Sequence, residues 1–311
     1  MHQNRDYSAS ETGQSAAYAY PVFLDTAIGD DLNNALALAL ILQSPEIDLQ
    51  GISTISGDTR LRAQLAAHLL AVFGRSDVPV AAGEAGEIQP QEGEGNVFQA
   101  EILPKHLPAP LISEHSGTDL LIEAALAHAG KITVISIGPL TNLAKALQRE
   151  PKIFRAIRRV ILMGGSSGIP LTDWNIRNDI EAAHKVFASG IPLTCVGLNV
   201  ALHCQLHKQD IARLKKSPTP RAQVISELMG LWQQHRPNWQ AGLPFLHGPL
   251  AVAALCHPSV LTFQEMPIRL LTKGPFKGTT VARVPGGTWV EAATRVSAED
   301  AREWMLQRWL S

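Results

Sequence analysis

The sequence predicts an α/β fold with an open, mostly parallel sheet flanked by helices. Two observations carry this prediction. Short apolar runs alternate with segments of helical pattern along most of the 311 residues. These runs are continuously apolar, which is typical of strands covered by helices on both faces. No internal repeat or linker interrupts the pattern, so we expect a single domain over residues 20–311.

The expected strands are short runs rich in branched apolar residues. In chain order they are Pro21–Leu24, Leu49–Ile55, Val78–Ala81, Ile132–Ser136, Arg159–Met163 and Leu193–Val196. Helices are expected between them, most clearly at Asn34–Gln43, which is apolar nearly all round, and at Leu61–Phe73. Near the C-terminus, the glycine and proline residues of Phe276–Trp289 predict a hairpin, and Ala298–Leu310 predicts an amphipathic helix.

Composition excludes several classes of protein. Hydrophobic residues make up 45% and charged residues 18%, and the formal net charge is -1. This balance gives no electrostatic reason to expect nucleic acid or an anionic membrane as a partner. No apolar run is long enough to cross a bilayer. The three cysteines form no CxxC pair, and their odd number argues against a disulfide framework, so we expect a reduced, cytoplasmic setting.

Two segments are expected to lie outside the regular structure. Residues 1–19 are polar and lack the hydrophobic stretch of a secretion signal, so we expect a disordered N-terminal tail. Gly83–Gly95 is rich in glycine, glutamate and glutamine, which predicts a loop.

Binding sites in parallel sheets form at the carboxyl ends of the strands. The segments that follow the expected strands are Asp25–Asp31, Ser56–Thr59, Ile137–Pro139, Met163–Gly165 and Gly197–Asn199. The first is the most specific. From Leu24 to Leu38 the chain has the sequence LDTAIGDDLNNALAL, which resembles the signature of the inosine/uridine-preferring nucleoside hydrolases.

The resemblance to this family extends over nearly the whole chain after the tail. Further matching segments are Ile52–Arg62, Val78–Gly83, Gly138–Ala144, Val160–Gly165, Ile180–Ala183 and His247–Ala253. Their number, order and spacing make a chance resemblance improbable. The resemblance implies the family's fold and its reaction, the hydrolysis of a ribonucleoside to base and ribose. In the family, aspartates of the signature loop bind a calcium ion, which binds a water and two ribose hydroxyls.

The chain departs from the family pattern at the residues that bind the ion. Ala27 stands where the family has the aspartate that ligates calcium and acts as general base. Asn34 and Gly248 stand where two further aspartate ligands occur, and Asn33 stands where an aspartate contacts ribose. A backbone carbonyl ligand of the family falls at Ile137. Calcium takes six to eight oxygen ligands, several of them carboxylates, so we expect no calcium and no other cofactor.

The resemblance also assigns roles to the polar residues that remain. His247 matches the proposed proton donor to the leaving base, and Asp25 is a candidate general base in a rearranged site. The expected substrate-binding residues are Asn33, Asn34, Asp173 and Asn175. Structural roles are the alternatives: Asn33 or Asn34 could cap a helix, and Asp25 could accept backbone N–H bonds. Asp58 fits a helix cap better than a ribose contact.

Three hypotheses about function follow. The chain could be a weak hydrolase that uses Asp25 or Asp31 as base, a non-catalytic protein that binds a ribosyl compound, or a hydrolase inactivated by design. Removal of a general base typically costs about 10²–10⁴-fold in rate, and loss of the metal adds several kcal/mol, so the residues favour the second hypothesis slightly. The expected partner is a small ribosyl compound, and the resemblance implies a homodimer or homotetramer.

Overall fold

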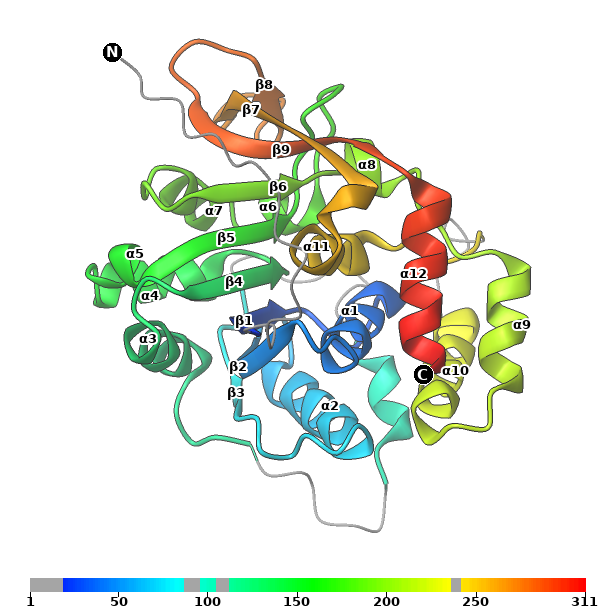
Figure 1. The fold of residues 1–311 in the computed structure, drawn as a ribbon. Coiled ribbons are helices and arrows are strands. Elements are labelled where there is room, and N and C mark those ends of the chain that lie inside the picture. The colour runs from blue at the N-terminus through cyan, green and yellow to red at the C-terminus, as the bar shows by residue number, and fades with distance from the viewer. Residues whose placement is uncertain (1–18, 87–95, 105–111, 236–241) are drawn as a thin grey trace, which may run out of the picture.

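The computed structural model describes residues 19–86, 96–104, 112–235 and 242–311. Within these residues, one sheet has the strand order β3-β2-β1-β4-β5-β6-β9-β7-β8 (Figure 1). Its strands are β1 (Tyr20–Thr26), β2 (Ile47–Thr54), β3 (Val80–Ala82), β4 (Ile132–Ile137), β5 (Ile157–Met163), β6 (Leu193–Val196), β7 (Leu261–Leu270), β8 (Thr280–Ala282) and β9 (Thr288–Val296). Strands β1 to β6 are parallel, and β9 is parallel to β6, which confirms the predicted sheet.

Helices cover both faces of this sheet (Figure 1). They are α1 (Leu32–Leu42), α2 (Thr59–Val72), α3 (Gly117–Ala127), α4 (Thr141–Arg149), α5 (Ile153–Ala156), α6 (Trp174–Asn178), α7 (Ile180–Phe187), α8 (Leu198–Ala201), α9 (Lys208–Lys216), α10 (Pro220–His235), α11 (His247–Cys256) and α12 (Ala298–Leu310), with 3₁₀ turns η1 (Phe98–Ile102) and η3 (Pro258–Val260). Every strand and helix named in the sequence prediction is present except the hairpin.

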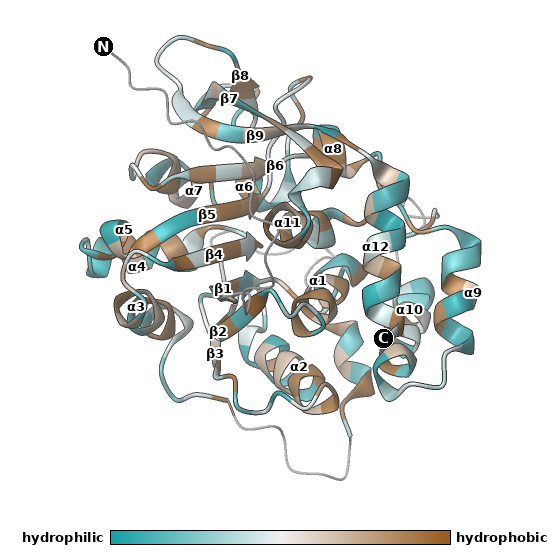
Figure 2. Ribbon diagram, in the orientation of Figure 1, coloured by the Kyte–Doolittle hydropathy of each residue, from teal (hydrophilic) through white to brown (hydrophobic). Residues whose placement is uncertain are grey.

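Two buried apolar clusters form the core, one on each face of the sheet. Alternate residues of a strand point to opposite faces, and β1 shows this directly: Val22 and Leu24 belong to one cluster and Phe23 to the other. The first cluster includes α1, α2, α10, α11 and α12, and the second includes α3, α4 and α7. Continuous apolar runs are therefore required in the central strands, because both of their faces are covered (Figure 2).

The helix α1 lies inside the molecule. All of its residues except Leu42 are buried, and it packs against α11 and α12. On α12, the indole N–H of Trp309 donates a hydrogen bond to the backbone oxygen of Leu36 at 3.2 Å. This helix lies between the carboxyl end of β1 and the helices α11 and α12. Because it is covered on all sides, it needs apolar residues around its whole circumference.

The predicted hairpin over Phe276–Trp289 is wrong. Strands β8 and β9 do not pair with each other; each pairs antiparallel with an edge of β7. The chain crosses β7 at Gly287, where a β-carbon would lie 2.8–2.9 Å from the backbone of Ile268, so only glycine fits. Alternation along a segment predicts a strand but not the strand with which it pairs. Here the partner is β7, which lies outside the predicted segment and pairs with β8 along one edge and with β9 along the other.

The remaining expectations concern segments and surfaces. The predicted tail lies outside the described residues except for Ala19, and so does the part of the predicted loop at 87–95. In the described part of the chain, no helix is both long enough and apolar enough to span a membrane. Cys195, Cys204 and Cys256 are free thiols.

Candidate functional site

The structure brings the predicted loops together at one edge of the sheet. Strand β1 lies between β2 and β4, so the chain winds in opposite directions on its two sides. In open α/β sheets, ligands commonly bind outside the carboxyl ends of the strands at such a point. Thr26 pairs with Ile137, so the loops after β1 and β4 start side by side. A β-carbon at Gly138 would lie 3.1 Å from the backbone nitrogen of Ala27. The glycine therefore allows these two loops to touch.

Asp25 lies at the centre of this edge and is fully buried. Its Oδ1 accepts hydrogen bonds from the hydroxyl of Ser53 at 2.6 Å and from the amide Nδ2 of Asn142 at 2.8 Å. Oδ2 is also buried and has no hydrogen-bond partner among the described residues. The donors to Asp25 are thus side chains and not the backbone N–H groups that the structural alternative expected, and its role as a base remains a prediction.

The environment of Asp25 changes its acidity. Burial raises the pKa of Asp25 to about 6, and the hydrogen bonds from Ser53 and Asn142 oppose that rise. The carboxyl group therefore loses its proton at a higher pH than an ordinary aspartate does.

The loop after β1 is organised around a buried arginine. Arg62 comes from α2 and is fully buried. Its guanidinium donates hydrogen bonds to the backbone oxygens of Ala27 at 2.8 Å, Ile28 at 2.7 Å and Ser56 at 2.7 Å. It also forms an ion pair with Asp30 at 3.0 Å. The positive charge of Arg62 thus lies against the segment that contains Ala27. The carboxylate of Asp30 is already its ion-pair partner.

The start of α1 contacts the start of α11 directly. Oδ1 of Asn33 accepts a hydrogen bond from the backbone N–H of Gly248 at 2.9 Å. A β-carbon at position 248 would lie 2.9 Å from that same oxygen, so a larger residue would displace Asn33. Asn33 and Asn34 are both buried within the first turn of α1, and Asp31 caps the helix by accepting a hydrogen bond from Asn33 N–H. The prediction that Asn33 or Asn34 caps this helix is therefore wrong.

His247 is the first residue of α11 and lies close to the same loop. Its ring stacks on Phe245, with 5.4 Å between the ring centroids, and its Nε2 is buried without a hydrogen-bond partner among the described residues. Burial lowers the pKa of His247, and the negative charge of Asp31 acts in the opposite direction. The neutral form of the ring is therefore favoured at pH 7, and in this form the ring can still form hydrogen bonds.

Asp173 and Asn175 lie after β5 and are both engaged within the fold. Asp173 caps α6 through a hydrogen bond from Ile176 N–H at 3.1 Å, and burial raises its pKa to about 6. Nδ2 of Asn175 donates to the backbone oxygen of Met163 at 2.9 Å. Both side chains are almost completely buried. They shape the carboxyl edge beside β5, and their predicted contacts with a substrate remain a prediction.

The donors at the family calcium positions do not fit a calcium ion. Ala27 and Gly248 have no side-chain oxygen, and Asn34 offers only a neutral amide oxygen. The carboxylate of Asp30 already binds Arg62, and that of Asp31 caps α1. In the described ranges, no group of three or more His, Cys, Asp or Glu side chains could hold a metal ion. Too few charged oxygens remain for a hard dication.

Sequence reasoning missed two residues of this site. Asn142 bridges the loops: it donates to Asp25, and its Oδ1 accepts from Glu84 N–H at 2.9 Å. The signal was available, because Asn142 lies in the segment Gly138–Ala144 that resembles a family motif. Arg62 also lies in a matching segment, Ile52–Arg62, but its burial was not predicted, because a charged residue on a helix is usually solvent-exposed. Asp58, by contrast, caps α2 as predicted.

Comparison with known proteins identifies the family of this chain. Residues 22–303 match the inosine-uridine preferring nucleoside hydrolase family. The chain is 33% identical to a probable uridine nucleosidase of Arabidopsis thaliana over 84% of each chain. It is 32% identical to a pyrimidine-specific ribonucleoside hydrolase of Salmonella paratyphi A, over 85% of this chain and 88% of that one. A plant nucleoside hydrolase structure superposes with a TM-score of 0.80 at 25% identity, over 94% of this chain and 99% of that one.

The raised pKa of Asp25 predicts how stability depends on pH. The folded pKa of about 6 lies above the unfolded value, so the protonated carboxyl favours the folded state below about pH 4. That contribution is lost as pH rises through 6. In Asp25→Asn the decline in unfolding free energy between pH 4 and 7 should be smaller than in the wild type by about 2–3 kcal/mol. Urea denaturation at each pH measures it.

The control for this experiment is Asp48→Asn, because Asp48 is exposed on β2. Its pH profile should match that of the wild type. Parallel profiles for Asp25→Asn and the wild type would show that the buried carboxyl does not retain its proton up to pH 6.

Proposed function

Because the chain belongs to the inosine-uridine preferring nucleoside hydrolase family, we propose that it binds a ribosyl compound at the carboxyl edge of β1 and β4 without calcium, and hydrolyses it slowly or not at all. The observation that carries this proposal is the state of the loop after β1. Its substituted positions offer no carboxylate, and its remaining carboxylates are used by Arg62 and by the start of α1. Uridine is the first candidate ligand, because two relatives are named for uridine or pyrimidine nucleosides.

Rapid hydrolysis requires groups that this loop lacks. Cleavage of the N-glycosidic bond passes through a ribosyl cation, and a nucleophilic water must be oriented and deprotonated. Ala27 can do neither. Loss of a general base costs about 10²–10⁴-fold in rate, and positioning is then the main contribution that remains.

Recognition of a sugar does not need the ion. Amide side chains can donate to and accept from hydroxyl groups, and the carboxyl edge contains Asn33, Asn34, Asp173 and Asn175. His247 adds a buried nitrogen without a partner among the described residues, next to the same loop. These groups support binding of a neutral ribosyl compound, and the net charge of the chain gives no support for nucleic acid as an alternative ligand.

Weak hydrolysis is the second candidate function, and one observation favours it. Oδ2 of Asp25 is buried without a hydrogen-bond partner in the described part of the chain, and burial raises the pKa of this carboxyl to about 6. Such a group can take a proton from a bound water at neutral pH. His247, which is neutral at that pH, could then donate a hydrogen bond to the leaving base.

The first prediction here concerns calcium. Calorimetric titration of the wild-type protein should reveal no calcium site tighter than about 10⁻⁵ M, because the substituted positions supply too few charged oxygens. The triple variant Ala27→Asp, Asn34→Asp, Gly248→Asp is the matched comparison, since it restores the three carboxylates. A sensor-like affinity in the wild type would overturn the metal-free proposal.

The second prediction concerns turnover. Hydrolysis of uridine and inosine should be far below about 1 s⁻¹, the lower end of the ordinary enzyme range. If a slow rate is found, Asp25→Asn should abolish it, whereas Asp31→Asn should keep it, because asparagine also caps a helix. Liquid chromatography of the released base measures both. Turnover above that level would mean that another base serves the reaction.

The third prediction concerns binding. Ligand-observed NMR should detect ribose or uridine in the millimolar to high-micromolar range, equivalent to about −4 to −6 kcal/mol, and a chelator should not change the signal. Asp173→Ala and Asn175→Ala should weaken it, with circular dichroism to verify folding because both residues are buried. The proposed ribosyl binding is contradicted if no ribosyl compound gives a signal, or if both folded variants bind as the wild type does.

A further inference from the structure

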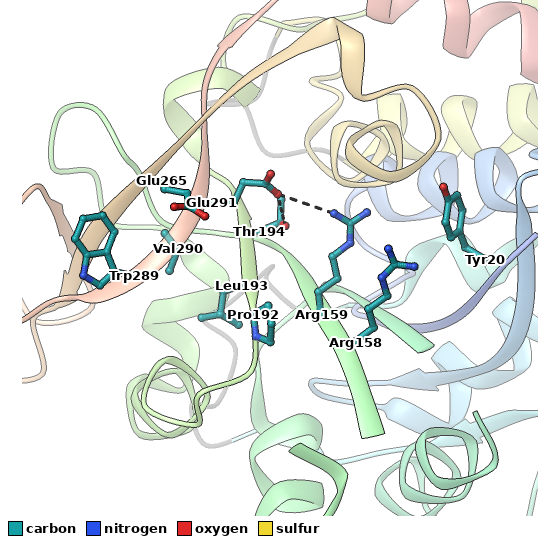
Figure 3. A pocket seen from close by; sticks show the side chains of 10 residues that line it. All are labelled: Tyr20, Arg158, Arg159, Pro192, Leu193, Thr194, Glu265, Trp289, Val290 and Glu291. Carbon is teal, nitrogen blue, oxygen red and sulfur yellow. Dashed lines mark hydrogen bonds and ion pairs between the residues drawn. The ribbon is translucent and has the colours of Figure 1, made fainter. Parts of the chain in front are cut away.

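Figure 3 shows a pocket lined by Arg158, Arg159, Glu265 and Glu291. It lies at the end of the sheet opposite the carboxyl ends of β1 and β4, where the ribosyl compound is proposed to bind. Its volume is about 430 Å³, which lies within the range of small-molecule sites. It is lined by residues at the amino ends of parallel strands, including Tyr20 on β1 and Arg158 and Arg159 on β5. The proposed ribosyl function uses the carboxyl ends, so nothing in that function accounts for this pocket.

A β-bulge aims two consecutive arginines into the pocket. Ile132 of β4 pairs with Ile157 and Thr133 pairs with Arg159, so Arg158 is an extra residue in the ladder. In a regular strand, neighbouring side chains point to opposite faces, and a bulge can re-aim one of them. Arg158 and Arg159 accordingly both line the pocket and extend side by side (Figure 3).

Arg159 has hydrogen-bonding capacity that the protein does not use. Its Nε is buried and has no partner among the described residues. Its Nη1 lies 3.9 Å from Oε2 of Glu291, at the limit for an ion pair. Burial also lowers the pKa of this guanidinium, which reflects an incompletely compensated charge. A guanidinium with a free edge is suited to a carboxylate or phosphate, which it binds through two parallel hydrogen bonds.

The other half of the pocket is acidic. Glu265 on β7 lies directly opposite Glu291 on β9 in the antiparallel ladder, and like charges in this arrangement destabilise the pair. The hydroxyl of Thr194 holds Glu291 in place at 2.7 Å. In the described part of the chain, β6 and β9 pair through Thr194–Glu291 and Cys195–Ala292, and the pocket lies at the amino end of this short ladder.

We propose that this pocket binds the zwitterion of a free α-amino acid with an apolar or aromatic side chain. The carboxylate would lie on the free edge of Arg159, with Arg158 beside it, and the ammonium group would lie between Glu265 and Glu291. A ligand with only a negative charge would leave the charges of the two glutamates uncompensated. A ligand with only a positive charge would leave the charges of the two arginines uncompensated. Trp289 lines the acidic end and is 69% exposed, so it offers an apolar surface to the ligand side chain.

Three related probes test the proposal by isothermal titration calorimetry. L-Phenylalanine carries both charges, 3-phenylpropionate lacks the ammonium group, and 2-phenylethylamine lacks the carboxylate. L-Phenylalanine should bind at least about tenfold more tightly than either of the others, because each loses one charge-assisted contact. Uridine should not compete with it, since the two sites lie at opposite edges of the sheet. This competition separates a failure here from a failure of the ribosyl proposal.

Two variants locate the contacts. Arg159→Gln should reduce L-phenylalanine affinity to the level of 2-phenylethylamine, and Glu291→Gln should reduce it to the level of 3-phenylpropionate. Arg155→Gln is the matched control, because Arg155 is an exposed arginine that does not line the pocket. The proposal is overturned by equal binding of the three probes, by no binding of L-phenylalanine at millimolar concentration, or by unchanged binding in folded Arg159→Gln.

Discussion

The buried carboxylate of Asp25 is the contact on which the carboxyl edge of the sheet depends. It receives hydrogen bonds from Ser53 on β2 and from Asn142 at the start of α4, and Asn142 in turn accepts from the N–H of Glu84 beyond β3. The side chains of Asp25 and Asn142 together therefore connect segments at the ends of four strands, β1 to β4. An apolar residue there would leave buried donors unsatisfied, which costs about 1–3 kcal/mol for each group.

Around this centre, the polar groups of the loop after β1 satisfy one another. Arg62 binds the backbone oxygens of Ala27 and Ile28, and Asn33 accepts from Gly248. The guanidinium of Arg62 also forms an ion pair with Asp30. The backbone oxygens of Ala27 and Ile28 are thus hydrogen-bonded within the protein. The residues that would restore the ion, above all a side chain at Gly248, would disturb contacts that the loop now uses.

The sequence was sufficient for features encoded locally and insufficient for features that depend on distant partners. Continuous apolar runs identified β1 to β6, and the rule that sites follow parallel strands located the loops that meet at Ala27 and Gly138. The pairing of β8 with β7 was missed, because alternation does not specify a partner. Arg62 was missed because its acceptors are backbone oxygens of other segments. The pocket at Arg159 was missed because a bulge is a property of two paired strands.

Most polar residues at the carboxyl edge are needed by the fold, so their presence alone says little about chemistry. Asp173 caps a helix, Asn175 binds a strand end, and Asn33 joins two helices. The two candidate catalytic residues differ from these: Oδ2 of Asp25 and Nε2 of His247 are among the buried side-chain atoms without a hydrogen-bond partner within the described residues. An unsatisfied buried polar atom is costly unless a water or ligand meets it. These two atoms, and not the larger polar set, are therefore where a bound ribosyl compound or a reactive water would gain most.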